Sequence, residues 1–107
     1  MNIEILREYV LQKPLVEEGF PFGDTVIVFK VNGKIFLLVP LDTEQLQFNV
    51  KCDPEKAIEL REQYDCILPG YHMNKKYWNT VIIDGQLSRH QLEEFIQASY
   101  KLVSKKK

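Results

Sequence analysis

The dipeptide Asn32-Gly33 limits the folds open to this chain more than any other feature. It separates two runs rich in β-branched and aromatic residues, TVIVFKV (25–31) and KIFLLVPL (34–41). Both central residues of a type I′ turn need a positive φ, which asparagine and glycine adopt more readily than other residues. The sequence therefore predicts a β-hairpin at this point, and with it an antiparallel sheet.

Helices are predicted at both ends of the chain and once in its middle. The first is expected over residues 2–13, with Asn2 as its N-cap. The second, over residues 54–64, begins with an Asp-Pro pair, which is typical of a capped helix start. In the third, Ser88 and Gln91 stand three residues apart and predict a capping box.

Strands are predicted near Val16, over residues 46–52 and over residues 77–84, while Pro69-Gly70 is predicted to form a turn. Apolar and polar residues alternate in 46–52, which indicates a sheet with one face in water. The order of elements predicts one α+β domain over residues 1–107, with an antiparallel sheet of about five strands and helices packed on one face. The expected core consists of Phe29, Phe36, Leu38, Phe48, Val50, Leu60, Val81, Ile83, Phe95 and Ile96.

Length and composition are those of an ordinary globular domain. The chain has 107 residues, of which 45% are apolar and 27% are charged. No apolar run approaches the roughly 18–20 residues that span a bilayer, and the N-terminus lacks the apolar segment of a signal peptide. We therefore expect a cytoplasmic protein, in which Cys52 and Cys66 are free, packed thiols.

Charge is unevenly distributed along the chain although the net charge is only −1. Residues 1–65 contain 7 Lys/Arg and 12 Asp/Glu, whereas residues 66–107 contain 7 and 3. This asymmetry permits a basic face built from the segment PGYHMNKKYW (69–78) and the last helix. It does not require one, because halves of a sequence need not correspond to faces of a fold.

The residue types used in catalysis and metal binding are present but not suitably spaced. Cys52 has only His72 as a conceivable base, and no spacing brings the two together. Cys52, Cys66, His72 and His90 form none of the usual zinc patterns. Glycine-rich phosphate loops are also missing from the sequence. We therefore expect no cofactor, no metal site and no enzymatic activity.

The segment 69–78 has two interpretations. Lys75 and Lys76 could neutralise phosphates, Asn74 could pair with a base edge, and the neighbouring aromatic residues could stack on bases. Alternatively, the segment is a polar edge of the fold, anchored by Trp78 packing inward. The residues alone leave both interpretations open.

Several segments together resemble the MmcQ/YjbR family of small bacterial proteins. In order and spacing they are FPFGD (20–24), FKVNGK (29–34), NVKCDP (49–54), PGYHMNKKYW (69–78) and SYKLV (99–103). The resemblance implies a fold likened to a "double wing" DNA-binding motif, and one family member is associated with mitomycin C resistance. Many relatives have histidine where this chain has Tyr77, so a catalytic or metal-binding role for that position is not expected here.

The resulting hypothesis is a cytoplasmic, non-catalytic protein that binds double-stranded DNA through a modest basic surface, with the hairpin as a wing. The residues expected to contact DNA are Asn74, Lys75, Lys76 and Lys101, helped by the lysines at 105–107. One alternative is a small-molecule binding protein whose pocket is lined by Tyr71, His72 and Trp78. Another is a protein-interaction adaptor, which would expose an apolar patch.

Overall fold

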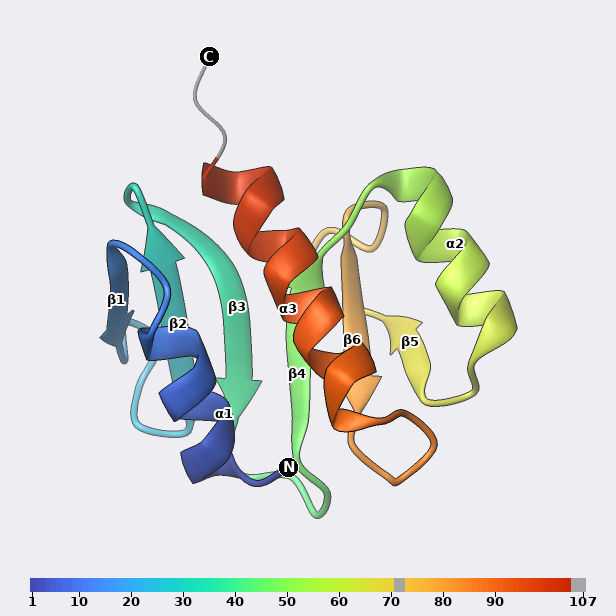
Figure 1. The fold of residues 1–107 in the computed structure, drawn as a ribbon, viewed down its shortest axis with the longest axis horizontal. Helices are drawn as coiled ribbons and strands as arrows, with labels where there is room; N and C mark the ends of the chain where they lie inside the picture. Colours follow the sequence, from blue (N-terminus) through green and yellow to red (C-terminus); the bar gives the residue numbers. More distant parts are fainter. Residues whose placement is uncertain (71–72, 105–107) are drawn as a thin grey trace.

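A computed structural model describes residues 1–70 and 73–104, and it shows an antiparallel sheet with helices on one face (Figure 1). The elements within these residues are α1 (Ile3–Leu11), β1 (Val16–Gly19), β2 (Val26–Val31), β3 (Lys34–Pro40), β4 (Gln47–Lys51), α2 (Pro54–Gln63), β5 (Ile67–Pro69), β6 (Trp78–Ile82) and α3 (Arg89–Ser104). The strands lie in the order β1-β2-β3-β4-β6-β5. The predicted α+β class is confirmed, with six strands in the described residues rather than about five.

The main hydrophobic core lies between the sheet and helices α1 and α3. Phe29, Phe36 and Phe48 come from the three central strands β2, β3 and β4, and their side chains are fully buried. Leu92 and Ile96 of α3 pack against them. Within residues 1–70 and 73–104, no helix combines the length and apolar character needed to cross a membrane.

A second, smaller cluster lies on the face of the sheet that carries neither α1 nor α3. It is formed by Val28, Leu38 and Trp78. Leu38, predicted as a core residue, is buried there rather than beneath the helices. The prediction of Ile83 and Phe95 as core residues was too strong, because both side chains are only partly buried at the margin of the main core.

The predicted β2–β3 hairpin is confirmed, with φ values of 54° at Asn32 and 75° at Gly33. The register shifts between Phe29 and Lys30, which marks a bulge in the pairing of β2 with β3. The Asn32 side-chain amide donates to the carbonyl oxygen of Ser104 at 3.4 Å. The turn is thereby joined to the C-terminal end of α3.

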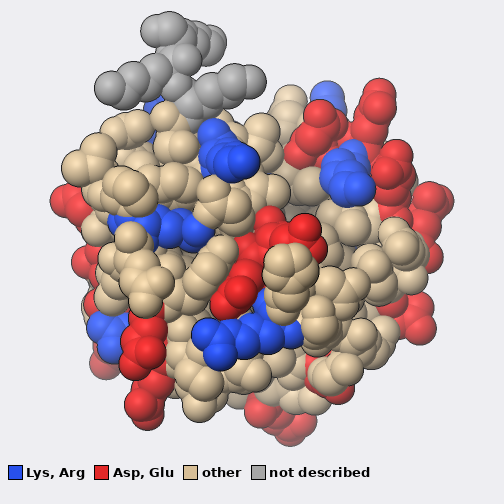
Figure 2. All heavy atoms as spheres, viewed as in Figure 1, with Lys and Arg blue, Asp and Glu red and all other residues tan. Residues whose placement is uncertain are grey.

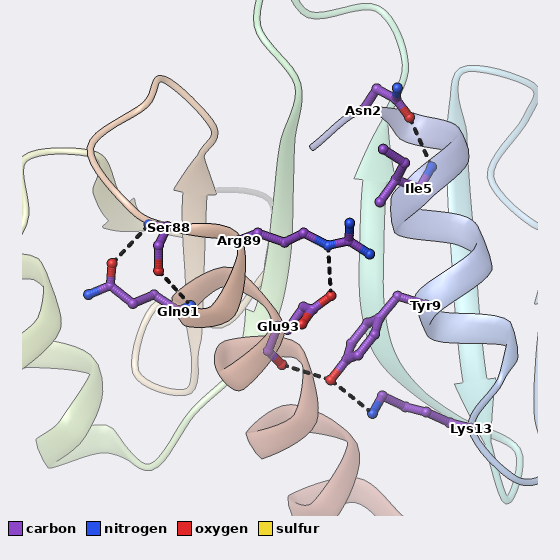
Figure 3. Close-up of polar contacts among 8 residues, drawn as sticks. All are labelled: Asn2, Ile5, Tyr9, Lys13, Ser88, Arg89, Gln91 and Glu93. Atoms are coloured by element: carbon purple, nitrogen blue, oxygen red, sulfur yellow. Dashed lines mark hydrogen bonds and ion pairs between the residues drawn. The ribbon is translucent and has the colours of Figure 1, made fainter.

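Side chains cap the helices as the sequence predicts (Figure 3). Asn2 Oδ1 accepts a hydrogen bond from a backbone amide in the first turn of α1 at 2.9 Å. At the start of α3, Ser88 and Gln91 satisfy each other's backbone amides through their side chains, at 2.9 and 3.2 Å. Tyr9 of α1 donates its hydroxyl to the carbonyl oxygen of Glu93 at 3.2 Å, so the two helices are also joined to each other.

Ser99 is a buried polar residue that fixes α3 on the sheet. Its Oγ donates to the carbonyl oxygen of Phe36 at 2.6 Å and accepts from the backbone amide of Lys51 at 2.9 Å. Buried backbone groups that lack a partner are costly, so this hydroxyl satisfies one group on each of two neighbouring strands.

The sequence did not predict β5. Ile67–Pro69 pairs with β6, and Gly70 extends the contact by donating its amide to the Trp78 carbonyl oxygen at 2.9 Å. A Cβ atom placed on Gly70 would lie only 2.9 Å from the Trp78 Cβ atom. Glycine at position 70 thus permits the close approach of two strands. Its carbonyl oxygen also accepts from the Met73 amide at 3.0 Å, a contact that agrees with the turn predicted at Pro69-Gly70.

Candidate nucleic-acid interface

The loops of the antiparallel sheet lie at one or the other of the two ends of its strands. We call these two ends of the sheet its edges. Val31 pairs with Lys34 and Lys51 pairs with Trp78, so the hairpin turn, the end of β4 and the segment before β6 share one edge. The C-terminal end of α3 reaches the same edge, which lies at the top of Figure 1. The loops 20–25, 41–46, 64–66 and 83–88 lie at the other edge.

These four loops form what we call the acidic edge. They contain Asp24, Asp42, Glu44, Asp65 and Asp84. None of the four loops contains a lysine or an arginine. Every charged side chain in these four loops is therefore negative, which disfavours the approach of a polyanion.

The opposite edge collects lysines from four separate elements. We call Lys34, Lys51, Lys75, Lys76 and Lys101 the basic edge. All of them are exposed except Lys51, which is half-buried. Asp53 and Glu55, at the start of α2, interrupt this edge.

Sequence reasoning found part of the basic edge and missed the rest. It brought together the lysines of segment 69–78 and of the last helix, which do lie at one edge of the sheet. Lys34 and Lys51 were missed because they belong to the acidic half of the sequence. The predicted hairpin turn fixes one edge of the sheet, and in an antiparallel sheet every second loop lies at the same edge. This rule would have placed Lys34 and Lys51 together at the edge of the hairpin turn.

The broad face that carries the helices is not basic. Figure 2 shows lysine and arginine side chains there interspersed with aspartate and glutamate. Arg89 pairs with Glu93 at 3.0 Å, and Arg7 forms two hydrogen bonds with Glu18 at 2.6 and 2.8 Å. Each of these two arginines is thus paired with a carboxylate on this face.

Asn74 shapes the segment that carries two of the basic-edge lysines. Its Oδ1 accepts from the backbone amide of Lys76 at 2.9 Å, and its carbonyl oxygen accepts from the amide of Trp78 at 3.0 Å. Arg61 of α2 donates to the carbonyl oxygen of Lys75 at 3.1 Å. The two lysines therefore project from an ordered turn, and the side-chain oxygen of Asn74 is already used within the protein.

The predicted small-molecule pocket falls partly outside the described residues. Tyr71 and His72 lie in the part of the chain that the structure does not describe, as do the lysines at 105–107. Trp78 is only 7% exposed and packs in the second cluster, with Met73 against it. Its side chain therefore belongs to the fold rather than to an open aromatic platform.

The two cysteines are free thiols with low tendency to ionise. Burial raises the pKa of Cys52, and the neighbouring carboxylate of Asp53 raises it further. The pKa of Cys66 is raised by burial and by Asp84. Across residues 1–70 and 73–104, no three His, Cys, Asp or Glu side chains converge in a way that could hold a metal ion.

Large apolar side chains are exposed at several separate places. Phe20 and Phe22, in a loop of the acidic edge, are 50% and 62% exposed. Ile58 of α2 and Leu102 of α3 are also exposed. These residues belong to different elements, and scattered apolar exposure is usual on protein surfaces.

Fold and charge distribution together define a class: an α+β protein with one helix-covered sheet face and oppositely charged sheet edges. A family model described as YjbR matches residues 11–102. The chain belongs to the YjbR family.

Relatives and solved structures agree with this assignment. The chain is 39% identical to the uncharacterized protein YbdF of Escherichia coli O157:H7, over 94% of this chain and 82% of YbdF. It is 32% identical to the uncharacterized protein YjbR of E. coli K12, over 94% and 85% of the two chains. The crystal structure of Deinococcus radiodurans protein DR2400 is similar, with a TM-score of 0.92 and 38% identity over 98% of this chain and 80% of that one.

Proposed function

We propose that the protein is a non-catalytic, cytoplasmic DNA-binding protein that contacts duplex DNA with its basic edge. The observation that supports this proposal most is the sorting of charge between the two sheet edges. In a chain with a net charge of −1, the acidic loops lie together at one edge and exposed lysines lie at the other. Such a distribution orients an approaching polyanion toward one end of the molecule.

The shape of the basic edge fits contacts with the phosphate backbone. Asn32, Gly33 and Lys34 are exposed at the tip of the β2–β3 hairpin, which would act as a wing at the same edge as Lys76 and Lys101. Lysine is a point charge on a flexible stem, so it suits phosphates better than base edges. We expect modest affinity and little sequence preference.

The test is a fluorescence anisotropy titration with a labelled DNA duplex. With four phosphate contacts, affinity should fall by about 100-fold between about 50 and about 200 mM salt. The variant Lys76→Gln/Lys101→Gln should bind more weakly, and its salt slope should be lower by about 2 because each lost contact lowers it by about 0.9.

The matched control is Gln45→Glu/Gln63→Glu. It changes the net charge by the same amount at exposed positions away from the basic edge. This control should retain most of the affinity and the full salt slope. An absence of binding near 50 mM salt, or an equal loss in both double variants, would refute the proposal.

A further inference from the structure

A groove of about 220 Å³ lies on the helix-free face of the sheet, beside the acidic edge. Gln47 and Asn49 of β4 and Thr80 and Ile82 of β6 form adjacent cross-strand pairs and line the groove. Leu68 of β5 lies next to Thr80 on the outer side. The groove is thus at the opposite end of the sheet face from Trp78.

One hydrogen bond between two lining residues orients the side-chain amide of Asn49 in this groove. The hydroxyl of Thr80 donates to Oδ1 of Asn49, and the Thr80 residue is only 8% exposed. With Oδ1 of Asn49 engaged by Thr80, the Nδ2 group of Asn49 is the hydrogen-bond donor that this pair can present to a bound molecule. A group that donates hydrogen bonds favours an acceptor such as a carbonyl oxygen.

Charge in the groove comes from one residue. Asp42, in the loop that follows β3, is the single charged side chain among the described residues that line it. Since no cation is among the described lining residues, this carboxylate favours an ammonium group over a neutral or anionic one. Opposite, Leu68 is 37% exposed and offers an apolar surface.

From these features we infer that the groove binds a small amine in which an ammonium group, a carbonyl oxygen and a short apolar chain are close together, as in an amino-acid amide. The ammonium group pairs with Asp42, the carbonyl oxygen accepts from Asn49, and the apolar chain packs on Leu68 and Ile82. Small-molecule sites commonly combine apolar walls with a few placed polar groups in this way. The site is separate from the basic edge and does not depend on DNA binding.

Three probes of one skeleton test the inference: leucinamide, N-acetylleucinamide and N-acetylleucine, which are cationic, neutral and anionic. Each is titrated into the ¹⁵N-labelled protein, and two-dimensional NMR spectra are followed. Leucinamide should shift the backbone amides of Gln47, Asn49 and Thr80, together with the side-chain amide of Asn49. The other two probes should shift them less, in the order of their charge.

Two substitutions in the same loop provide a matched pair. Asp42→Asn should weaken leucinamide binding by about two- to fivefold, the range expected for a partly exposed ion pair. Glu44→Gln removes a carboxylate that does not line the groove, and it should leave the binding unchanged. Absent shifts, equal shifts with all three probes, or equal effects of the two substitutions would overturn the inference.

Discussion

Replacing Gly70 with alanine is expected to destabilise the protein through one close contact. A Cβ atom on residue 70 would lie 2.9 Å from the Cβ atom of Trp78 and 3.2 Å from its carbonyl carbon and oxygen. The atoms that would have to move are mainly backbone, in a strand that pairs with both β4 and β5. A rotamer change cannot relieve such a contact.

The size of the effect follows from two opposing contributions. Forcing an extra carbon into a packed site costs about 1–3 kcal/mol. Alanine also restricts the unfolded chain, which returns about 0.4–1 kcal/mol where the native backbone tolerates it. We expect Gly70→Ala to lower the free energy of unfolding by about 1–2 kcal/mol, with a fall in Tm of about 4–8 °C for each kcal/mol.

Urea unfolding followed by circular dichroism measures this difference. The matched control is Gly19→Ala in β1, where the nearest atom to an added Cβ, Pro21 Cδ, is 3.9 Å away. That variant should be as stable as the parent or slightly more stable. If Gly70→Ala were also as stable as the parent, the close approach of β5 and β6 would not be the reason for glycine at position 70.

Two further predictions concern polar contacts. Ser99→Ala leaves the Phe36 carbonyl and the Lys51 amide without the hydroxyl that each now contacts. The free energy of unfolding should therefore fall by about 1–3 kcal/mol. A loss no larger than that of the control Ser104→Ala would contradict this prediction. The hydrogen bonds from Arg7 hold the pKa of Glu18 below its ordinary value of 4.5. The stabilisation from this pair is therefore present above about pH 4.5 and is lost as the pH falls through the lower folded-state pKa. Glu18→Gln should lower the free energy of unfolding by about 1 kcal/mol or less at neutral pH. In denaturant titrations at pH values well below the folded-state pKa, the parent and the variant should be equally stable. A difference in stability that persists in acid would refute the assignment.

Local signals allowed much of the fold to be predicted. The Asn32-Gly33 turn and the Ser88–Gln91 capping box depend on residues within a few positions of each other, so the sequence contains all the information they need. The strand around Phe48 was also predicted, because the alternation of apolar and polar residues indicates which side chains are buried. Helices, strands and turns could therefore be predicted wherever the conformational preferences of neighbouring residues favour the same element.

Long-range pairing accounts for what was missed. β5 is too short to carry an alternating pattern, and it forms because β6 provides a partner. Likewise, Lys34 and Lys51 are 17 positions apart and join the basic edge only through strand register. The role of Asn74 in ordering its own turn is local, but the same residue type also suits a base contact, so sequence could not separate the two.

The two outermost strands determine how the sheet ends. β1 has four residues, and β5 has three, the last of which is Pro69. A proline has no backbone N–H to donate, and such short strands offer few groups to a further strand. Edge-to-edge aggregation needs a long and regular template, and this protein provides none at β1 or β5. The short strand β5, which was not predicted from the sequence, therefore also disfavours edge-to-edge growth of fibrils.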